Sequence, residues 1–487
     1  MGDLDPDRFR SEARQVVDWV ADYRAGLADR PVQPDIPPGW VRANLRTLLT
    51  EIPRPVADLL AELDRVVVPA SMHWQHPGFF GYFPANSSLH SLLGDLLSGG
   101  LGPQGMLWST SPAATEVEQL LMDGLATELG LGPGFTFAGG GGGSIQDSAS
   151  SSSLVALLGA LNRTSGGAWR TDGVDGRERV YLTAETHSSM AKGVRVAGLG
   201  ERAVRVVGSE PGSSAMSPAC LAAALAEDVA AGLRPTMVCA TVGTTGTGAV
   251  DDLAALAEAG RPYGVWLHVD AAWAGVAALC PEHRHLIAGV EEVDSFCTDA
   301  HKWLLTAFDA SMLWVRDARA LPDALSITPE YLRNPASEAG EVVDYRDWQV
   351  PLGRRFRALK LWAVINGFGL SGLREHLRSH VAMAADLADR VRADGRFALA
   401  AAPLLSLVCI RVVTGRGPLA DDRAGRLVVE RVNAAGRQFL SHTVVADRFV
   451  IRIAVGSVAT RQADVDALWD RLCAERDRAC AEAVAVP

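Results

Sequence analysis

The sequence has few cysteines, no long run of apolar residues and no excess of positive charge. Its seven cysteines are scattered and form no Cys-x-x-Cys pair, a pattern that suits reduced thiols rather than a disulfide framework. No uncharged apolar segment approaches the roughly 18 to 20 residues that a membrane-spanning helix needs. The acidic start, Met1 to Asp7, lacks the basic and apolar regions of a secretory signal. These absences predict a cytoplasmic protein.

Charge and ligand spacing exclude two further classes of function. The net charge of −11 argues against a nucleic-acid or anionic-membrane partner, because both need a clustered positive surface. Cys280, His283 and His285 lie close together in the sequence, but a tetrahedral metal site needs three or four converging ligands, and no distant second cluster completes this one. We therefore expect no metal site.

What the sequence does have is length and apolar content. With 487 residues, 48% of them hydrophobic, the chain exceeds the usual size of a single core. We expect an N-terminal helical segment (1–87), a large α/β domain (88–359) and a small α+β domain (360–487). The short N-terminal helices cannot enclose a core of their own. We expect them to pack on a second copy of the chain, since most soluble oligomers are symmetric homo-oligomers.

Short β-rich runs alternate with helical segments from about residue 135, which predicts an α/β fold with a mostly parallel sheet. The predicted strands are Val180–Thr183, Ala203–Val207, Thr236–Thr241, Val265–Asp270 and Ser295–Thr298. In the small domain we expect strands near 406–412, 439–445 and 449–455, with helices near 421–436 and 462–480. Polar residues follow the carboxyl ends of the first set, where ligands bind in open α/β sheets. These residues are His187, Thr244, Thr245, Asp270, His301 and Lys302.

Lys302 is central to this predicted site. It lies between Ser295–Cys297 and Trp303–Leu305, whose apolar character draws the lysine into the interior, where an ammonium is costly unless it is paired. A desolvated lysine is a suitable amine for an imine with pyridoxal phosphate. A nearby carboxylate such as Asp270 is a suitable partner for the ring nitrogen, although Asp270 could instead cap the helix that follows it.

The glycine run Gly139–Gly143, followed by Ser148–Ser151, predicts a phosphate site. A glycine-rich turn that leads into a helix offers free N–H groups to an anion. By itself the run fits a flexible linker equally well, and the presence of Lys302 downstream favours the phosphate cradle. His187 can be a structural residue or can stack on an aromatic cofactor ring.

Two loops have open interpretations. The segment His73–Asn86 is dense in aromatic and turn residues and is either a core-lining loop or the wall of a substrate pocket. The polar stretch Ser326–Tyr345 is long and lacks apolar periodicity, which is typical of a functional lid or a disordered insert. We expect this second stretch to be mobile.

Several of these residues also carry a family resemblance. The sequence resembles, over nearly its whole length, the group II pyridoxal-phosphate decarboxylases, specifically the aromatic-L-amino-acid decarboxylases. The matching motifs are His73-Trp74, Ser111 to Glu116, His268 to Ala272, Cys280 to Glu282, His301 to Leu304, Asp344 to Gln349 and Gly353 to Arg357. The resemblance implies a fold-type I homodimer whose active sites are shared between the subunits.

The resemblance also implies roles for individual residues. Lys302 would form the imine, Asp270 would pair with the pyridinium nitrogen, and His187 would stack on the ring. Other cofactor contacts would come from Ala149, Ser150, Thr245, Ala272, Asp299 and His301, and Asp299 would place a negative charge near the phosphate. Tyr331 would reach the neighbouring subunit's site and protonate the substrate carbon after carbon dioxide leaves, which a phenol can do at neutral pH.

The choice of reaction and substrate follows from the same comparison. Relatives that make aldehydes typically alter the position of Tyr331 or His187, and this chain retains both, which favours decarboxylation. The implied substrate pocket contains Trp74, Tyr82, Phe83, Pro84, Ala85, Gln104, Met106 and Gly353. Ala85 replaces a common threonine, which weakens the case for a catechol, and Gly353 leaves room for an indole. We expect tryptophan, with phenylalanine, tyrosine and dihydroxyphenylalanine open. The rival interpretations are an aldehyde synthase or another amino-acid lyase of this fold, and a non-catalytic or metal-dependent protein.

Overall fold

The computed structural model describes residues 3–45, 48–210, 212–327, 329–332 and 335–485. The chain forms two compact units. The first unit consists of Met1–Pro84, Asp389–Ala400 and Ile410–Pro487, and the second of Ala85–Ala388 and Ala401–Cys409. Within the described ranges, no helix combines the length and the apolar character that crossing a membrane requires.

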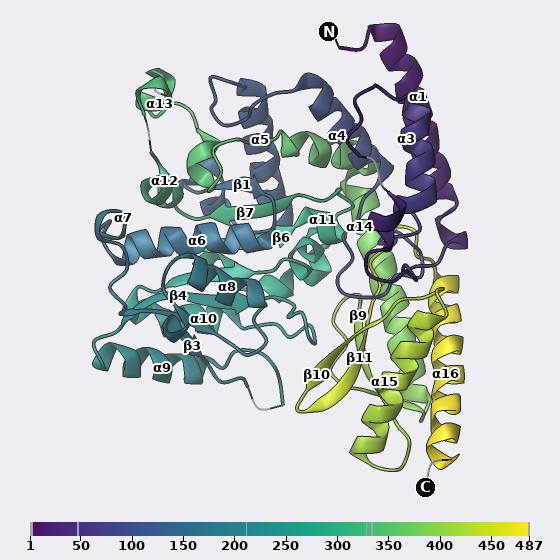
Figure 1. Cartoon of the computed structure of the whole chain (residues 1–487). Helices are drawn as coiled ribbons and strands as arrows, with labels where there is room; N and C mark the ends of the chain where they lie inside the picture. The colour runs from purple at the N-terminus through teal and green to yellow at the C-terminus, as the bar shows by residue number, and fades with distance from the viewer. Residues whose placement is uncertain (1–2, 46–47, 211, 328, 333–334, 486–487) are drawn as a thin grey trace. The chain divides into compact units, whose positions relative to one another are not determined.

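The second unit is an α/β domain with one seven-stranded sheet (Figure 1). Its strands are β1 (Gly142–Gln146), β2 (Glu178–Leu182), β3 (Val204–Val206), β4 (Arg234–Thr241), β5 (Trp266–Asp270), β6 (Ser295–Asp299) and β7 (Ser311–Val315). Their order is β1-β7-β6-β5-β4-β2-β3, and only β7 pairs antiparallel with its neighbours. All five strands predicted in this region are confirmed. The sequence pattern does not predict β1 or β7, because glycines interrupt the first and the second is a short run without a distinctive boundary.

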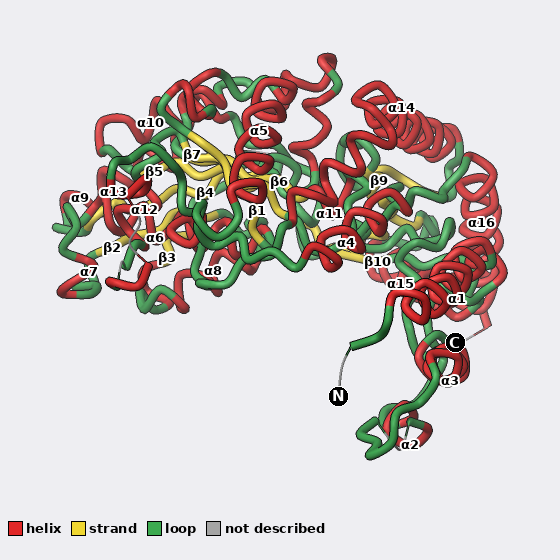
Figure 2. The backbone as a smooth tube through the Cα atoms, turned by 90° about the horizontal axis from the view of Figure 1, so that it is seen from above, coloured by secondary structure: helices red, strands yellow, loops and turns green. Residues whose placement is uncertain are grey.

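Helices cover both faces of this sheet. The helices of this unit are α4 (Leu89–Leu101), α5 (Pro112–Leu129), α6 (Ala149–Thr164), α7 (Trp169–Asp172), α8 (Ser188–Val196), α9 (Pro218–Ala230), α10 (Leu253–Gly260), α11 (Ala300–Trp303), α12 (Ala320–Leu325), α13 (Pro335–Glu338) and most of α14 (Arg357–Ala393). Figure 2 shows α5 and α10 on one side of the strands and α8 on the other. Helix α6 packs across β4 to β7, where Val155, Leu157 and Trp266 are buried in the core.

The glycine run does not lead directly into a helix, so that part of the prediction is wrong. Gly142 and Gly143 begin β1, and α6 starts only at Ala149. A Cβ atom on Gly141 would lie 2.1 Å from the carbonyl oxygen of Gly134, and one on Gly143 would lie 2.6 Å from the Met122 side chain. These glycines therefore allow close packing around the start of the strand.

The first unit joins the N-terminal helices to a small sheet. Its helices are α1 (Pro6–Ala25), α2 (Trp40–Asn44), α3 (Val56–Glu62), α15 (Pro418–Ala434) and α16 (Gln462–Ala485), and its sheet has the order β10-β11-β9-β8. These strands are β8 (Phe397–Leu399), β9 (Leu407–Val412), whose residues 407–409 belong to the second unit, β10 (Ser441–Val445) and β11 (Arg448–Ala454). Three of the four strands and both C-terminal helices are confirmed predictions.

The predicted division into three parts differs from these two units. The backbone N–H of Phe80 donates to the carbonyl of Phe439 at 2.9 Å, and the N–H of Ala454 donates to the carbonyl of Phe80 at 2.9 Å. Such backbone hydrogen bonds attach the N-terminal segment to the C-terminal sheet. A local sequence pattern does not predict a pairing between residues so far apart in the chain. The predicted boundary after residue 359 falls inside α14.

The polar stretch Ser326–Tyr345 contains a 3₁₀ turn, Glu330–Leu332, and the short helix α13. Thr328, Arg333 and Asn334 within it lie outside the described residues, as does the side chain of Tyr331. The prediction of a mobile lid therefore stays a prediction.

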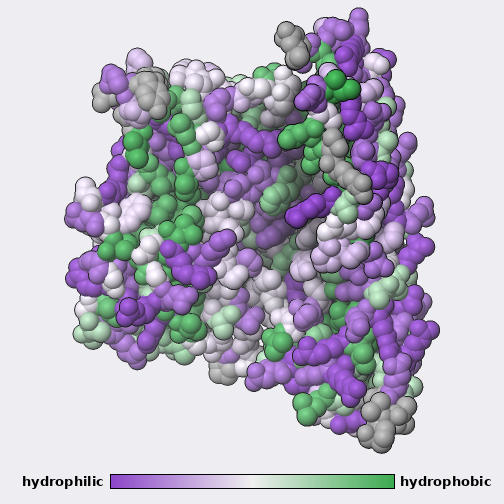
Figure 3. Space-filling view, in the orientation of Figure 1, coloured by the Kyte–Doolittle hydropathy of each residue, from purple (hydrophilic) through white to green (hydrophobic). Residues whose placement is uncertain are grey.

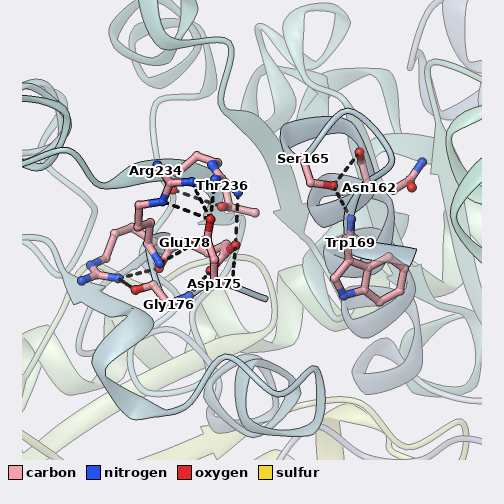
Figure 4. Close-up of polar contacts among 10 residues, drawn as sticks. Asn162, Ser165, Trp169, Asp175, Gly176, Glu178, Arg234 and Thr236 are labelled. Atoms are coloured by element: carbon pink, nitrogen blue, oxygen red, sulfur yellow. Dashed lines mark hydrogen bonds and ion pairs between the residues drawn. The ribbon is translucent and has the colours of Figure 1, made fainter. Parts of the chain in front are cut away.

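An ion-pair cluster lies at the amino end of β2 and β4 in the second unit (Figure 4). Arg234 contacts Asp175 at 2.8 Å and Glu178 at 3.2 Å. The buried carboxylate of Glu178 also accepts a hydrogen bond from the backbone N–H of Gly176 at 3.0 Å. The buried carboxylate of Glu178 thus has both an opposite charge and a hydrogen-bond donor beside it.

Candidate active site

The carboxyl ends of β5 and β6 place two acidic side chains next to each other. Both strands end in an aspartate, Asp270 and Asp299, and both residues are buried. Ala272 links them, because its N–H donates to Asp270 Oδ1 at 3.0 Å and its carbonyl accepts from the N–H of Asp299 at 2.8 Å. The predicted edge of the sheet therefore does bring these three residues together.

Lys302 lies on the one-turn helix α11, directly after β6. Its Nζ is 2.9 Å from Asp299 Oδ2, and its side chain is 26% exposed against 2% for Asp299. Burial lowers the pKa of Lys302, but the carboxylates of Asp299 and Asp270 outweigh burial and hold that pKa above its ordinary value. Burial raises the pKa of Asp299, and Lys302, His301 and the Ser311 hydroxyl together bring it below the ordinary value. Lys302 and Asp299 thus form an ion pair in which the carboxylate is buried and the lysine side chain is partly exposed.

Asp270 is in a different electrostatic situation. Burial raises the pKa of Asp270 above its ordinary value, and the charges of Lys302 and His187 and the N–H of Ala272 only partly oppose this shift. Two buried carboxylates therefore share one ammonium, which lies closest to Asp299. A buried carboxylate without a full counter-charge is costly, so the position of Asp270 suits a ligand that brings a positive charge or an N–H donor.

His301 is buried beside the ion pair as a neutral ring. Its Nδ1 accepts a hydrogen bond from the N–H of Ala310 at 3.0 Å, so the proton of the neutral imidazole is on Nε2. That Nε2 is 3.5 Å from Asp299 Oδ2. Burial lowers the pKa of His301, although Asp299 opposes the shift.

Asn86 fixes the backbone that carries Lys302. Its side-chain amide donates to the carbonyl of Lys302 at 2.6 Å, and its N–H donates to the carbonyl of His301 at 2.7 Å. The neighbouring N–H of Ser88 donates to the carbonyl of Leu305 at 3.0 Å. Sequence reasoning assigns Asn86 only to the aromatic loop, since its partners are more than 200 residues away.

A buried histidine lies on the same strand as Asp270. His268 precedes Asp270 by two residues on β5, and its ring nitrogens lie 2.8 Å from Ser295 Oγ and 3.1 Å from Ser153 Oγ. Burial lowers the pKa of His268 to about 3. Because Ser153 belongs to α6, the ring connects that helix to β5 and β6. The alternation of side chains along a strand places residues 268 and 270 on one face, a signal that could have identified His268.

The residues predicted to bind an anion lie at the start of α6. Ser148 caps the helix, and its hydroxyl accepts from the N–H of Ser151 at 3.3 Å. Ala149 and Ser150 are the first two helical residues, whose N–H groups have no intrahelical acceptor in an α-helix. These two backbone groups could therefore bind a phosphate.

His187 and Thr245 occupy loops at the same edge and are exposed. His187 caps α8, where its Nδ1 accepts from the N–H of Ser189 at 3.3 Å. The loop of His187 follows β2, which runs parallel to the strands that lead to β5, and Asp270 ends β5 at the same edge. The structural and the cofactor-stacking interpretations of His187 are thus compatible with each other.

The predicted pocket residues fall into separate groups. In the second unit, the backbone N–H of Arg354 donates to Gln104 Oε1 at 2.7 Å. The backbone N–H of Arg346 donates to the carbonyl of Met106 at 3.0 Å. A Cβ added to Gly353 would lie 3.5 Å from Gln104 Nε2. Gln104 and Gly353 are therefore neighbours, while Ala85 directly precedes Asn86.

The other four predicted pocket residues belong to the first unit. The rings of Trp74 and Tyr82 stack with centroids 5.6 Å apart, and the Arg452 guanidinium lies 4.5 Å from the ring centre of Phe83. Pro84 is buried. Trp74 also packs against a core cluster that includes Phe79, which agrees with the core-lining interpretation. The role of the four residues in a substrate pocket stays a prediction.

The described part of the chain contains no group of three or more His, Cys, Asp or Glu side chains that could hold a metal ion. Cys280, considered above as a ligand, instead directs its thiol to the carbonyl of Arg374 at 3.7 Å.

Comparison with known proteins gives the site its context. The family described as "Pyridoxal-dependent decarboxylase conserved domain" matches residues 38–413. Tyrosine decarboxylase 2 of Narcissus pseudonarcissus is 40% identical over 476 residues, which cover 96% of this chain and 93% of the relative. Phenylacetaldehyde synthase of Arabidopsis thaliana is 40% identical over 474 residues, which cover 96% and 95%.

The fold agrees with these matches. A solved structure of Oryza sativa TDC with PLP and tryptamine has a TM-score of 0.95 and 40% identity, and the match covers 98% of this chain and 99% of that one. The fold-type I architecture predicted from the sequence is thereby confirmed, as is pyridoxal 5′-phosphate as the cofactor. The chain belongs to the group II pyridoxal-phosphate-dependent decarboxylases, in the aromatic-L-amino-acid decarboxylase family.

Proposed function

We propose that this enzyme converts an aromatic L-amino acid into the corresponding arylalkylamine and carbon dioxide. The observation that carries the proposal is the pair of buried carboxylates that share one ammonium at the ends of β5 and β6. Pyridoxal phosphate, when bound, supplies an aldehyde for the lysine and an electron-withdrawing ring that stabilises negative charge on the substrate carbon. Its protonated ring nitrogen would provide the counter-charge that Asp270 lacks.

The residues of the site fit this cofactor in distinct ways. Lys302 would bind the aldehyde carbon, and Asp270 would keep the ring nitrogen protonated. The backbone N–H groups of Ala149 and Ser150, at the positive end of the α6 dipole, would hold the phosphate. His187 would cover the ring face. Further contacts would come from Thr245, Ala272, Asp299 and His301.

Tyr331 is the proposed proton donor to the substrate carbon after carbon dioxide leaves. A phenol has an ordinary pKa near 10 and therefore keeps its proton at neutral pH until it is needed. The position of Tyr331 in the family motif supports this role. The proposal also places Tyr331 in the site of a second subunit.

We favour tryptophan as the substrate. Glycine at position 353 leaves space for an indole, and relatives of similar identity include Tryptophan decarboxylase 2 of Oryza sativa subsp. japonica. The amide of Gln104 borders that space and would discriminate among aromatic rings. Phenylalanine, tyrosine and dihydroxyphenylalanine are the alternatives.

A single assay tests the reaction and ranks the substrates. The purified enzyme, loaded with pyridoxal phosphate, is incubated with each of these four amino acids and with histidine, and the released carbon dioxide and amine are measured. Decarboxylation should release the two products in equal amounts. We expect the highest kcat/KM for tryptophan. Absence of carbon dioxide release from every aromatic amino acid would refute the proposed function, and a preference for another ring would refute only the choice of substrate.

The second candidate is an aldehyde synthase, because a phenylacetaldehyde synthase is as similar to this chain as the decarboxylases are. Such an enzyme consumes dioxygen and releases aldehyde, ammonia and hydrogen peroxide as well as carbon dioxide. We expect wild-type enzyme to release amine without peroxide. Tyr331→Phe, which lacks the proton donor, should release amine more slowly or divert product to aldehyde and peroxide. An unchanged product profile in this variant would remove Tyr331 from the mechanism.

We also propose that the enzyme is a homodimer. Leucines at helical spacing form an exposed stripe along α4, and each is at least half exposed: Leu89, Leu93, Leu96, Leu97 and Leu101. Figure 3 shows hydrophobic surface in the region where Figure 1 labels α4. An exposed apolar surface of this kind marks an interaction site, and a second copy is the partner that a symmetric oligomer supplies.

Light scattering coupled to gel filtration tests the dimer. Wild-type enzyme should have the mass of two chains, while Leu93→Glu should shift the mass towards one chain and reduce activity if the active sites are shared. A monomeric wild-type enzyme with full activity would overturn this proposal. The predicted cytoplasmic location remains to be tested by fractionation of the source cells.

A further inference from the structure

The reaction proposed above gives Asp299 only a contact with the cofactor, although its carboxylate lies 2.9 Å from the reactive nitrogen of Lys302. Its side chain is only 2% exposed. Its Oδ1 is buried and has no hydrogen-bond partner among the described residues. The backbone of Asp299 is fixed by the N–H bond to the carbonyl of Ala272. Asp299 is therefore held in place with its charge directed at one ammonium.

The groups that face this ion pair come from several elements. They are Asp270 on β5, Cys297 on β6, His301 on α11, Ser311 on β7 and, through Asp270, His187 at the start of α8. Burial keeps His301 neutral and raises the pKa of the Cys297 thiol well above its ordinary value. Asp299 and Asp270 are thus the anions that act on Lys302, and the second is the proposed partner of the cofactor ring.

We propose that Asp299 is a positioning residue that holds Lys302 as an ammonium whenever the lysine is not joined to the cofactor. An ammonium has no lone pair, so the ion pair must open and lose a proton before Nζ can react. Asp299 therefore limits how fast the cofactor-free protein captures an aldehyde at neutral pH. This inference rests on the proposed binding of the cofactor aldehyde by Lys302.

Capture of the aldehyde by Lys302 takes place in two stages. The Lys302 ammonium first gives one proton to solvent, which leaves a neutral amine. The Nζ lone pair then forms a bond to the aldehyde carbon, the carbon–oxygen double bond is replaced by a carbon–nitrogen double bond, and the aldehyde oxygen leaves as water. No oxidant or reductant takes part. Only the first event depends on the strength of the ion pair with Asp299.

The test compares two aldehydes that differ by the phosphate group. Cofactor-free wild-type protein and the variant Asp299→Asn are mixed with pyridoxal or with pyridoxal phosphate, and the rate of capture is followed by visible absorbance between pH 6 and 10. Asp323→Asn is the matched control, since it removes one negative charge from an exposed ion pair with Arg319 in the same unit. Melting temperatures of the cofactor-free variants establish that each one folds.

We expect Asp299→Asn to capture both aldehydes roughly tenfold faster at pH 7, because loss of a buried partner charge shifts a pKa by about one unit or more. Its rate profile should move to lower pH, and Asp323→Asn should match wild type. If Asp299→Asn does not fold, Asp299→Ser removes the same charge with a smaller side chain and carries the same expectation.

Two results would overturn the inference. An acceleration seen only with pyridoxal phosphate would mean that Asp299 acts by repelling the phosphate and not through Lys302. Unchanged or slower capture of both aldehydes would mean that the ion pair does not restrain the lysine. Failure of the underlying function is distinguishable, because Lys302→Ala would then capture the aldehydes as fast as wild type does.

Discussion

The two ends of the strands in the large sheet contain buried acids in opposite situations. At the amino end, Glu178 has the guanidinium of Arg234 at 3.2 Å and a backbone N–H donor (Figure 4). At the carboxyl end, Asp270 and Asp299 share the single ammonium of Lys302, and burial leaves the pKa of Asp270 raised. The first arrangement is electrostatically complete without a ligand. The second is completed by a ligand with a positive charge.

This difference separates structural charge from functional charge within one domain. Residues that pair among themselves, as Arg234 and Glu178 do, contribute to folding alone. Residues left with an excess of one sign at a sheet edge that binds ligands contribute to recognition. Substitutions at the carboxyl end should therefore reduce activity more than stability. Substitutions at the amino end should reduce stability more than activity.

The largest effect is expected for Lys302→Ala. The variant loses the amine that would bind the cofactor aldehyde, so the visible absorbance of the bound cofactor and the release of carbon dioxide should both fall to the level of a sample without enzyme. Lys192→Ala is the control, because Lys192 is an exposed lysine on α8 and its loss should change neither reading. Retention of both signals in Lys302→Ala would show that the site lies elsewhere.

A large but incomplete effect is expected for Asp270→Asn. An amide of nearly the same shape can still accept the N–H of Ala272, but it cannot supply the negative charge that keeps a ring nitrogen protonated. We expect the cofactor to remain bound and kcat to fall roughly a hundredfold or more, as for other losses of preorganised charge. Cofactor absorbance and single-turnover kinetics measure the two quantities separately. Full kcat with bound cofactor would remove Asp270 from the proposed mechanism.

The residues at the carboxyl end could be found from the sequence because their pattern is local. Asp270 and Lys302 each lie at or just beyond the end of a short predicted strand. The hydrophobic pattern and the β-branched or aromatic composition of a segment predict where such a strand ends. The five predicted strands and the edge they share are confirmed by the structure on this basis. The family motifs then identify the cofactor, which composition alone cannot do.

The residues that the sequence did not reveal depend on partners far along the chain. Asn86 holds the backbone of Lys302 across 216 positions, and Ser153 reaches His268 across 115. The attachment of Phe80 to the C-terminal sheet is of the same kind. The glycine run was predicted to lead into a helix, but it leads into β1. Glycine signals either a turn or close packing, and only the neighbours, such as Gly134 and Met122, distinguish the two.

The smallest effect is expected at the amino end of the sheet, for Asp175→Asn. Arg177 and then Arg234 hold the pKa of Asp175 well below its ordinary value. A carboxyl group with a lowered pKa in the folded state stabilises that state above its unfolded pKa of about 4, and this contribution is lost as the pH falls through the folded value. The group is exposed, so the contribution is small. The melting temperature of Asp175→Asn should be slightly below that of wild type at pH 7. The gap should begin to narrow as the pH falls below about 4, because Asp175 of the unfolded chain then binds a proton, and it should close only when the folded carboxyl is protonated at still lower pH. Activity should be unchanged. A loss of activity, or a gap that widens in acid, would contradict the assignment of a purely structural role to this end of the sheet.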